Sequence, residues 1–200
     1  MTADEERTDE SRDPRKPGPA ELEALFARNL HHVRAFVRLR LDADTRDKEA
    51  VSDIVQSACR EVLANENFEY RGEAEFRSYL CQAALHKIRG RRRHHQAQKR
   101  RAPKAQPLDS EVQLANVYRT TFFEPQRAAI RSEEIEQLEA AFERLPPDYR
   151  EALTLYRIGG MSVSDLAQHL GRTPGATQTL LSRAMARLTS VLGGKQPRDD

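Results

Sequence analysis

The chain has 200 residues, of which 32% are charged and 38% hydrophobic, and its formal net charge is only +2. This composition suits one large domain or two small ones and favours helix. We expect no membrane partner, because no stretch approaches about eighteen apolar residues. We expect no signal peptide either, because the N-terminus is acidic and lacks an apolar segment. A cytoplasmic location is therefore predicted.

Three apolar stripes with helical spacing follow a polar N-terminal segment. Residues 1–19 contain three prolines and ten charges within the first sixteen positions, so we expect a disordered tail. The stripes run from Leu22 to Leu41, from Val51 to Val62 and from Phe76 to Ile88. Three such helices predict a bundle of three or four helices over residues 20–101.

Pairs of cysteine and histidine residues could suggest a metal site, but their spacing argues against one. Cys59 and Cys81 fall inside predicted helices, without the CxxC or CxxxH spacing of zinc ligands. Adjacent histidines on a helix point about 100° apart and do not converge on one ion. We expect two reduced, buried thiols, no metal and no cofactor.

The stretch 102–131 separates two helical blocks. It contains Pro103, Pro107 and Pro125 and no persistent apolar stripe. Its length exceeds that of most loops inside compact domains, so it predicts a flexible linker and a domain boundary. The polar end, residues 193–200, is expected to be a second tail.

The second block, residues 132–192, has the start and stop signals of four helices. One helix ends near Leu145, and the next begins at Pro147 and ends at the glycine pair that follows Ile158. Ser162, with Asp165 three residues later, predicts the cap of a short third helix. The block is therefore expected to be all-α.

The last two predicted helices have the pattern of a helix-turn-helix. Gly171 stands where the turn needs a positive φ, and Ala167 where two crossing helices need a small side chain. Thr173 caps the second helix and Pro174 occupies its first position. The N-terminal residues of that helix would meet base edges in the major groove. A plain four-helix bundle remains the alternative on spacing alone.

A basic run at the end of the third stripe is a second candidate for nucleic-acid contact. Residues 87–104 hold nine Lys or Arg residues and no acid. The run can be a solvated helix end or a track for the DNA backbone, with Phe76 and Tyr79 nearby to stack on or support unpaired bases. Phe76 fits a core position better.

Three segments of the second block resemble region 4 of extracytoplasmic-function (ECF) sigma factors. They run from Leu145 to Leu153, from Gly160 to Gly171 and from Arg183 to Leu188. They align with that family without a gap. The resemblance implies an all-α helix-turn-helix domain that reads the −35 promoter element.

The first block resembles region 2 of the same family. Asp53-Ile-Val-Gln56 is similar to the family's Asp-Leu-Val-Gln-type motif, which docks on the polymerase clamp. The segments from Phe68 to Glu73 and from Phe76 to Leu80 are similar to its Phe-Arg-Gly-Glu and Phe-Arg-Thr-Trp-Leu segments. The two blocks cover about two thirds of the chain, in the order that the family has.

The resemblance implies a role for three sets of residues. Core polymerase would contact Asp53 and Gln56. The −10 DNA would contact Tyr79, His86, Lys87, Arg89, Arg91, Arg92 and Arg93. The −35 DNA would contact Arg172, Thr173, Gly175, Gln178, Thr179, Ser182 and Arg183.

Five positions depart from the family pattern, among them Thr177, which replaces a β-branched hydrophobe. Tyr79 replaces the usual Trp, and His86 stands where Asn is common. Gln178 and Leu180 stand where Lys or Arg is frequent, so residues 174–182 contain no cation. Since phosphate contacts dominate affinity, duplex binding by this domain alone should be weak. The alternative is that Gln178 and Leu180 face the protein core or another subunit, and of the two Leu180 fits this alternative better because its side chain is apolar.

The predicted function is that of an ECF sigma factor, which directs core RNA polymerase to promoters and is monomeric when free. The resemblance also allows for an anti-sigma factor as a partner. No phosphate loop, metal motif or nucleophile elbow indicates an enzyme. The main alternative is a helix-turn-helix regulator that acts without polymerase, and a weaker one is an RNA-binding helical protein. A regulator would carry a receiver or ligand domain with βα alternation where this chain has three helices.

Overall fold

The computed structural model describes residues 16–43, 46, 48–65, 68–95, 110–122 and 132–193. All the elements in this part of the chain are helices, as predicted. Of the expected tails at 1–19 and 193–200, only 16–19 and 193 are described, and there Pro19 begins a helix and Gly193 ends one, so both predicted boundaries are wrong by one residue. None of the described helices is long and apolar enough to cross a membrane.

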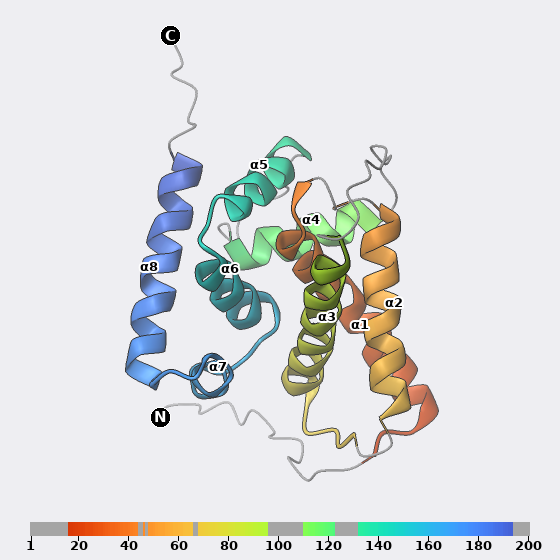
Figure 1. The fold of residues 1–200 in the computed structure, drawn as a ribbon. Helices are drawn as coiled ribbons and strands as arrows, with labels where there is room; N and C mark the ends of the chain where they lie inside the picture. Colours follow the sequence, from red (N-terminus) through yellow and green to blue (C-terminus); the bar gives the residue numbers. More distant parts are fainter. Residues whose placement is uncertain are drawn as a thin grey trace, which may run out of the picture.

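The N-terminal block consists of α1 (Pro19–Arg40), α2 (Lys48–Ala64) and α3 (Glu73–His95), which pack against one another (Figure 1). Proline at the first turn of α1 is tolerated, because the N–H that it lacks would have no partner inside the helix. The three predicted stripes form the buried faces. Their fully buried side chains include Leu25, Phe36, Phe76 and Leu85. Phe76 is therefore a core residue.

A fourth helix, α4 (Ser110–Phe122), lies where the sequence predicted a flexible linker. Its buried side chains are Leu114, Val117 and Tyr118, which pack against α1. The prediction of an unstructured linker is therefore wrong for residues 110–122. The helix was missed because its apolar stripe spans little more than one turn and lies among prolines. The rest of the predicted linker lies outside the described residues.

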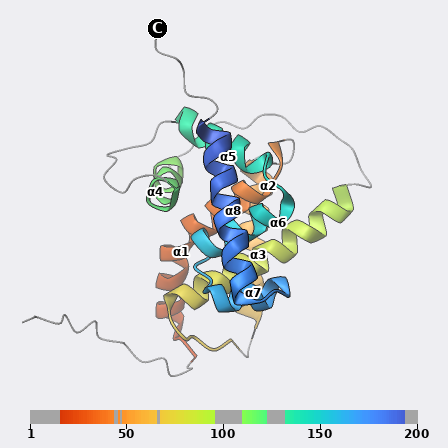
Figure 2. The same ribbon diagram turned by 90° about the vertical axis from the view of Figure 1, so that its left-hand side faces the viewer.

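The C-terminal block contains α5 (Ser132–Glu143), α6 (Pro147–Leu153), α7 (Val163–Leu170) and α8 (Pro174–Gly193), the four helices that the sequence predicted. Figure 2 shows α8 running past the ends of α5 and α7. Between α6 and α7 the helix widens into a π-helical turn, η2 (Thr154–Ile158), which the sequence did not predict. Such turns are often found at functional sites.

Gly159 closes the π-helical turn, and its lack of a side chain is required there. Its N–H donates to the carbonyl of Thr154 at 3.0 Å, five residues back. A Cβ at this position would lie 2.6 Å from the carbonyl oxygen of Leu155. The next residue, Gly160, has φ +73°, which turns the chain towards α7.

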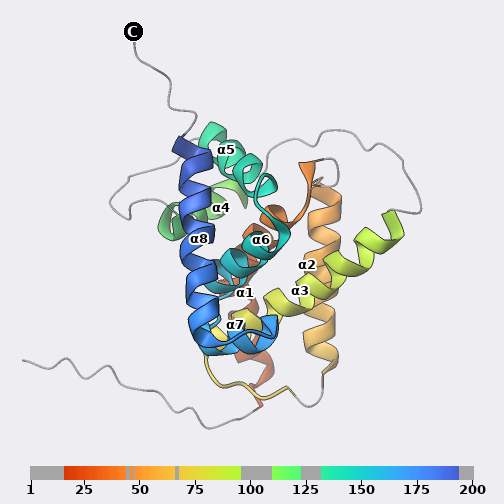
Figure 3. The same cartoon turned by 60° about the vertical axis from the view of Figure 1, so that its left-hand side comes forward.

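The two blocks share one apolar core. Figure 3 shows α1 lying between α2 and α3 on one side and the C-terminal helices on the other. Contacts of α1 with α5, α6 and η2 join the core of the N-terminal block to that of the C-terminal block. The relative placement of the two candidate DNA-binding surfaces is set by these contacts.

The two cysteines are free thiols, and Cys81 is buried as expected, whereas Cys59 is only partly buried. Burial raises the pKa of Cys81 to about 12, and burial also raises the pKa of the half-buried Cys59. Thiols held in the protonated form are weak nucleophiles and weak metal ligands. Among the described residues, no cluster of His, Cys, Asp and Glu could hold a metal ion.

Candidate nucleic-acid and polymerase interface

The turn between α7 and α8 has the geometry that the sequence predicted. Ser162 caps α7, since its Oγ accepts from the Asp165 N–H at 3.1 Å and donates to the Asp165 carboxylate at 2.6 Å. Gly171 follows α7 with φ +63°, and the Arg172 N–H donates to the Ala167 carbonyl at 2.9 Å. Ala167 itself is buried. The short helix, tight turn and longer helix form a helix-turn-helix.

The start of α8 divides cleanly between core and solvent. Thr173 caps the helix, its Oγ1 accepting from the Ala176 N–H at 3.3 Å. Thr177 and Leu180 are buried, so Leu180 belongs to the core, as its apolar side chain indicated. The side chains expected to meet −35 DNA are all exposed: Arg172, Thr173, Gln178, Thr179, Ser182 and Arg183, with Gly175 beside them.

The two residues predicted to contact core polymerase lie on the outer face of α2. Asp53 and Gln56 are both exposed, while the intervening Ile54 and Val55 are buried. A guanidinium nitrogen of Arg91 lies 3.8 Å from the Asp53 carboxylate. The motif therefore presents two polar side chains to solvent. One of them, Asp53, already lies near a cation of α3.

The described part of the basic run forms ion pairs with carboxylates of two other helices, α2 and α6. Lys87 pairs with Glu61 of α2 at 2.6 Å, and Arg89 pairs with Glu151 of α6 at 2.6 Å. His86 is exposed on the same helix. The side chains of Arg92 and Arg93 lie outside the described residues. In this arrangement DNA phosphates would have to compete with protein carboxylates for these cations.

A groove of about 930 Å³ lies between the N-terminal end of α3 and α7. Its apolar lining includes Phe68, Tyr79 and Met161, and its polar lining includes Asn65, Ser78 and Gln82. Four carboxylates also line it: Glu69, Glu73, Glu75 and Asp165. The groove thus brings Tyr79, a predicted −10 residue, together with side chains of the helix-turn-helix.

Glu151 of α6 is the centre of a contact between the two blocks. Its carboxylate accepts from Arg40 of α1 at 3.2 Å, from Arg89 of α3 at 2.6 Å and from His169 of α7 at 3.0 Å. Burial acts to raise the pKa of Glu151, but Arg40, His169 and Arg89 outweigh it, so the pKa lies below its ordinary value of 4.5. Arg40 is almost fully buried, and its ion pair with this carboxylate offsets part of the cost of burying its charge.

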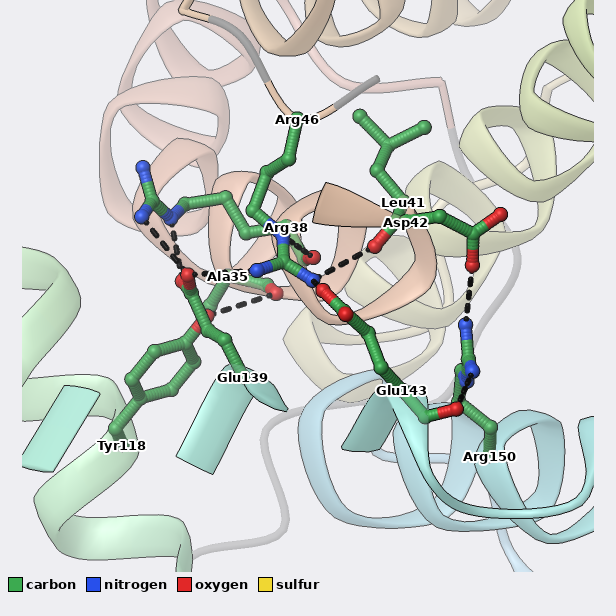
Figure 4. A network of polar contacts seen from close by, with 9 residues as sticks. All are labelled: Ala35, Arg38, Leu41, Asp42, Arg46, Tyr118, Glu139, Glu143 and Arg150. Carbon is green, nitrogen blue, oxygen red and sulfur yellow. Dashed lines mark hydrogen bonds and ion pairs between the residues drawn. The ribbon is translucent and has the colours of Figure 1, made fainter. Parts of the chain in front are cut away.

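A second polar network is centred on Glu139 and includes side chains of α1, α4, α5 and α6 (Figure 4). Glu139 of α5 is buried and accepts from Arg38 at 2.6 Å, from Arg46 at 3.1 Å and from the Tyr118 hydroxyl at 3.1 Å. Nearby, Arg150 of α6 donates to Asp42 at 3.0 Å. These bonds tie α1, α4, α5 and α6 together.

A third contact places Arg77 of α3 between α1 and the turn after η2. Its Nη1 lies 3.3 Å from His32 Nε2, and a Cβ on Gly160 would lie 3.2 Å from its Nη2. Burial, followed by the charge of Arg77, lowers the pKa of His32 to about 4. His32 therefore stays neutral near pH 7 and can accept from the guanidinium.

Sequence reasoning did not identify Glu139, Glu151 or Arg77 as contacts between blocks. Their partners lie far away in the chain, and no local pattern reports such pairs. The sequence held a weak indication that Arg40 is buried, because this cation lies among apolar residues of the first stripe. Asn65 and Phe68 were also missed as neighbours of Tyr79, since the loop between them and α3 has no periodicity.

Comparison with known proteins supports the resemblance of the second block to region 4. It also shows that most of the chain is similar to sigma factors. Residues 135–188 match the family described as Sigma-70, region 4. The ECF RNA polymerase sigma factors SigD of Mycobacterium bovis and Mycobacterium tuberculosis are 27% identical over 157 residues, which cover 78% of this chain and 69% of theirs.

A solved structure shares the fold. It is the sigma factor RpoE in complex with the anti-sigma factor NepR from Bartonella quintana, with a TM-score of 0.57 and 20% identity, covering 87% of this chain and 98% of that one. Residues 135–188 therefore match sigma-70 region 4, and over 157 residues the chain is similar to ECF RNA polymerase sigma factors. The likeness to the RpoE structure extends the common fold over 87% of the chain.

Proposed function

We propose that this chain acts as a sigma factor through two surfaces that the family resemblance assigns to separate tasks. The N-terminal block binds core RNA polymerase through Asp53 and Gln56 and holds the opened −10 DNA near Tyr79 and His86. The exposed side chains at the start of α8 contact the −35 element. The chain needs no catalytic group for this role, because polymerase supplies the chemistry.

The observation that carries the proposal is the division of α8 between core and solvent. Every residue that the resemblance assigns to −35 contact is exposed there, while Thr177 and Leu180 are buried. A recognition helix needs this arrangement, with its inner face held by the domain and its N-terminal outer face open to a groove of DNA. A helix-turn-helix regulator would need it too, but the SigD relatives align beyond this region, over 78% of the chain.

The absence of cations among the described side chains at the start of α8 fits a factor that depends on tethering. Gln178 can pair with adenine, a contact worth about 1–3 kcal/mol, but few charges there attract phosphate. Binding through the N-terminal block raises the local concentration of the −35 element beside α8. We expect the free chain to be a monomer and to bind promoter DNA weakly. An anti-sigma factor, as in the RpoE structure, is a further expected partner.

The proposal is tested by assembly with core polymerase. Purified chain is mixed with bacterial core RNA polymerase, and the affinity is measured by fluorescence anisotropy of the labelled chain. We expect stable association. Asp53→Lys should weaken the affinity for core polymerase at least about tenfold, because it reverses the charge at a contact with the clamp. Circular dichroism controls for folding. Failure of the wild-type chain to bind core enzyme would favour the regulator that acts without polymerase.

A further inference from the structure

We propose that the Tyr79 hydroxyl, positioned by Asn65, donates a hydrogen bond to an acceptor atom on the edge of an unpaired base in the groove beside α3. Tyr79 is then a residue that determines base preference, and Asn65 is a positioning residue. This inference rests on the proposed binding of opened −10 DNA by the N-terminal block.

The ring of Tyr79 is held in one orientation by aromatic contacts. It stacks on Phe68 with a centroid separation of 5.4 Å and an interplanar angle of 25°. Phe68 meets the edge of Phe76 at 5.6 Å, and Phe76 meets Phe26 of α1 at 5.4 Å. Since Phe76 is buried in the core, the chain of rings anchors Tyr79 to the rigid part of the bundle.

The hydroxyl of Tyr79 is oriented by one hydrogen bond from the loop before α3. The Asn65 side-chain amide donates to the Tyr79 oxygen at 2.7 Å. A phenol oxygen that accepts this bond still has its own proton to donate. That proton points away from Asn65, on the other side of the oxygen. Among the described residues no acceptor for that proton is found. Because Tyr79 lines the groove, an acceptor on a ligand there can complete the pair.

The surroundings favour a base over a phosphate as that ligand. Glu69, Glu73 and Glu75 line the groove on the N-terminal side, and Arg71 at the rim is paired with Glu69 at 2.9 Å. Carboxylates repel the nucleic-acid backbone but not a neutral ring. Ser78 and Gln82, which bond to each other at 3.3 Å, add polar groups suited to a base edge.

Hydrogen bonding to the hydroxyl and stacking on the ring make different demands. The hydroxyl proton lies in the plane of the ring, so the base must meet the edge of Tyr79 and cannot obtain this bond by stacking on its face. Stacking tolerates any base, whereas a donor at a fixed point favours bases that present an acceptor there. A single position of the −10 strand should therefore depend on the hydroxyl.

The test measures base preference with the holoenzyme. The −35 sequence that the holoenzyme prefers is first selected from random duplex DNA. Forked DNA is then built with this −35 duplex and a randomised single-stranded −10 segment, and the strands that the holoenzyme binds are sequenced. The variants are Tyr79→Phe, which keeps the ring, Asn65→Ala, which removes the amide, and Asn65→Asp. The carboxylate of the last variant accepts a hydrogen bond from the Tyr79 hydroxyl, so the hydroxyl proton is no longer free for a base. Tyr149→Phe of α6 is the matched control, because it removes a hydroxyl that does not line the groove.

We expect wild-type enzyme to prefer one base at one position, and Tyr79→Phe and both Asn65 variants to reduce that preference by about fivefold, the loss of one hydrogen bond. Preferences at other positions and those of Tyr149→Phe should not change. A preference that survives Tyr79→Phe overturns the role of the hydroxyl, and one lost only in Tyr79→Phe overturns the role of Asn65. If wild-type holoenzyme selects no −10 sequence at all, the proposed function itself fails.

Discussion

Arg89 of α3 and Glu151 of α6 form an ion pair of 2.6 Å that links the two helical blocks. Arg89 is one of the cations expected to hold −10 phosphates, while Glu151 belongs to the block expected to read the −35 element. The same carboxylate also holds Arg40 and His169. Promoter DNA that recruits Arg89 must therefore draw it away from the contact between blocks.

Replacing Glu151 with Gln should lower the free energy of unfolding by about 3 kcal/mol, because the buried Arg40 would lose its ion pair with the Glu151 carboxylate. Arg89→Gln should cost less than about 1 kcal/mol, because the Arg89 side chain is half exposed. Urea unfolding measures both. Glu136→Gln, at an exposed position of α5, is the matched control. Equal stability of Glu151→Gln and this control would contradict the account of Glu151.

The contribution of Glu151 should depend on pH. Its folded pKa lies below the ordinary value of 4.5, so its stabilising effect is complete above that pH and is lost as the pH falls through the folded value. The difference in unfolding free energy between wild type and Glu151→Gln should therefore be constant near pH 6–7 and shrink below pH 4.5. Urea titrations across this range provide the measurement. A difference that grows on acidification would show that the pKa is shifted upward.

Tyr118 should account for most of the stability that α4 adds to the molecule. Tyr118→Phe removes the hydroxyl that donates to Glu139 at 3.1 Å and lies 3.4 Å from the Ala35 carbonyl oxygen. Because Glu139 keeps Arg38 and Arg46, the change should cost about 1 kcal/mol. Tyr118→Ala also leaves a cavity and should cost about 3–5 kcal/mol. Hydrogen exchange should show protection over 110–122 in wild type and its loss in Tyr118→Ala. If exposed Gln113→Ala costs as much, packing of α4 is not the cause.

The helices and their caps were predictable from the sequence because their signals are local. Ser162, Gly171 and Thr173 each act on backbone groups within four residues, so spacing alone located the helix-turn-helix. Glu139 shows the opposite case. It lies in a run of five glutamates that looks solvated, and only its partners from α1 and α4 reveal that it is buried. Such pairs depend on tertiary packing, which periodicity does not encode.

The candidate DNA surfaces were predictable to different extents. The apolar side chain of Leu180 made it the likelier of Gln178 and Leu180 to face the core, and the structure buries Leu180 and exposes Gln178. The pairing of Lys87 with Glu61 and of Arg89 with Glu151 did not, because a run of cations gives no information about which distant carboxylates it meets. The π-helical turn was also unpredictable, since its extra residue per turn has no compositional signature.

Substitutions in α8 should separate DNA contact from core packing. Gln178→Lys adds a cation to an exposed position and should tighten binding of the full chain to promoter duplex, with a salt slope steeper by about one unit. Ser190→Lys adds the same charge near the other end of α8 and is the control. Anisotropy at several salt concentrations measures both. An identical effect of the two changes would mean that the charge acts only non-specifically.

Leu180→Arg should unfold the C-terminal block and not improve binding, because the side chain is buried and a charge there has no partner from the core. Thermal unfolding followed by circular dichroism tests this. A folded Leu180→Arg variant with tighter DNA binding would place residue 180 on the DNA face and change the assigned register of α8.

Initiation of transcription by reconstituted holoenzyme tests the sigma-factor assignment most directly. Bacterial core RNA polymerase, with and without the chain, transcribes a library of genomic fragments, and the 5′ ends of the transcripts are sequenced. The account predicts discrete start sites that need the chain and share upstream −35 and −10 sequences, and fewer such starts with Asp53→Lys. Start sites identical to those of core enzyme alone would contradict it.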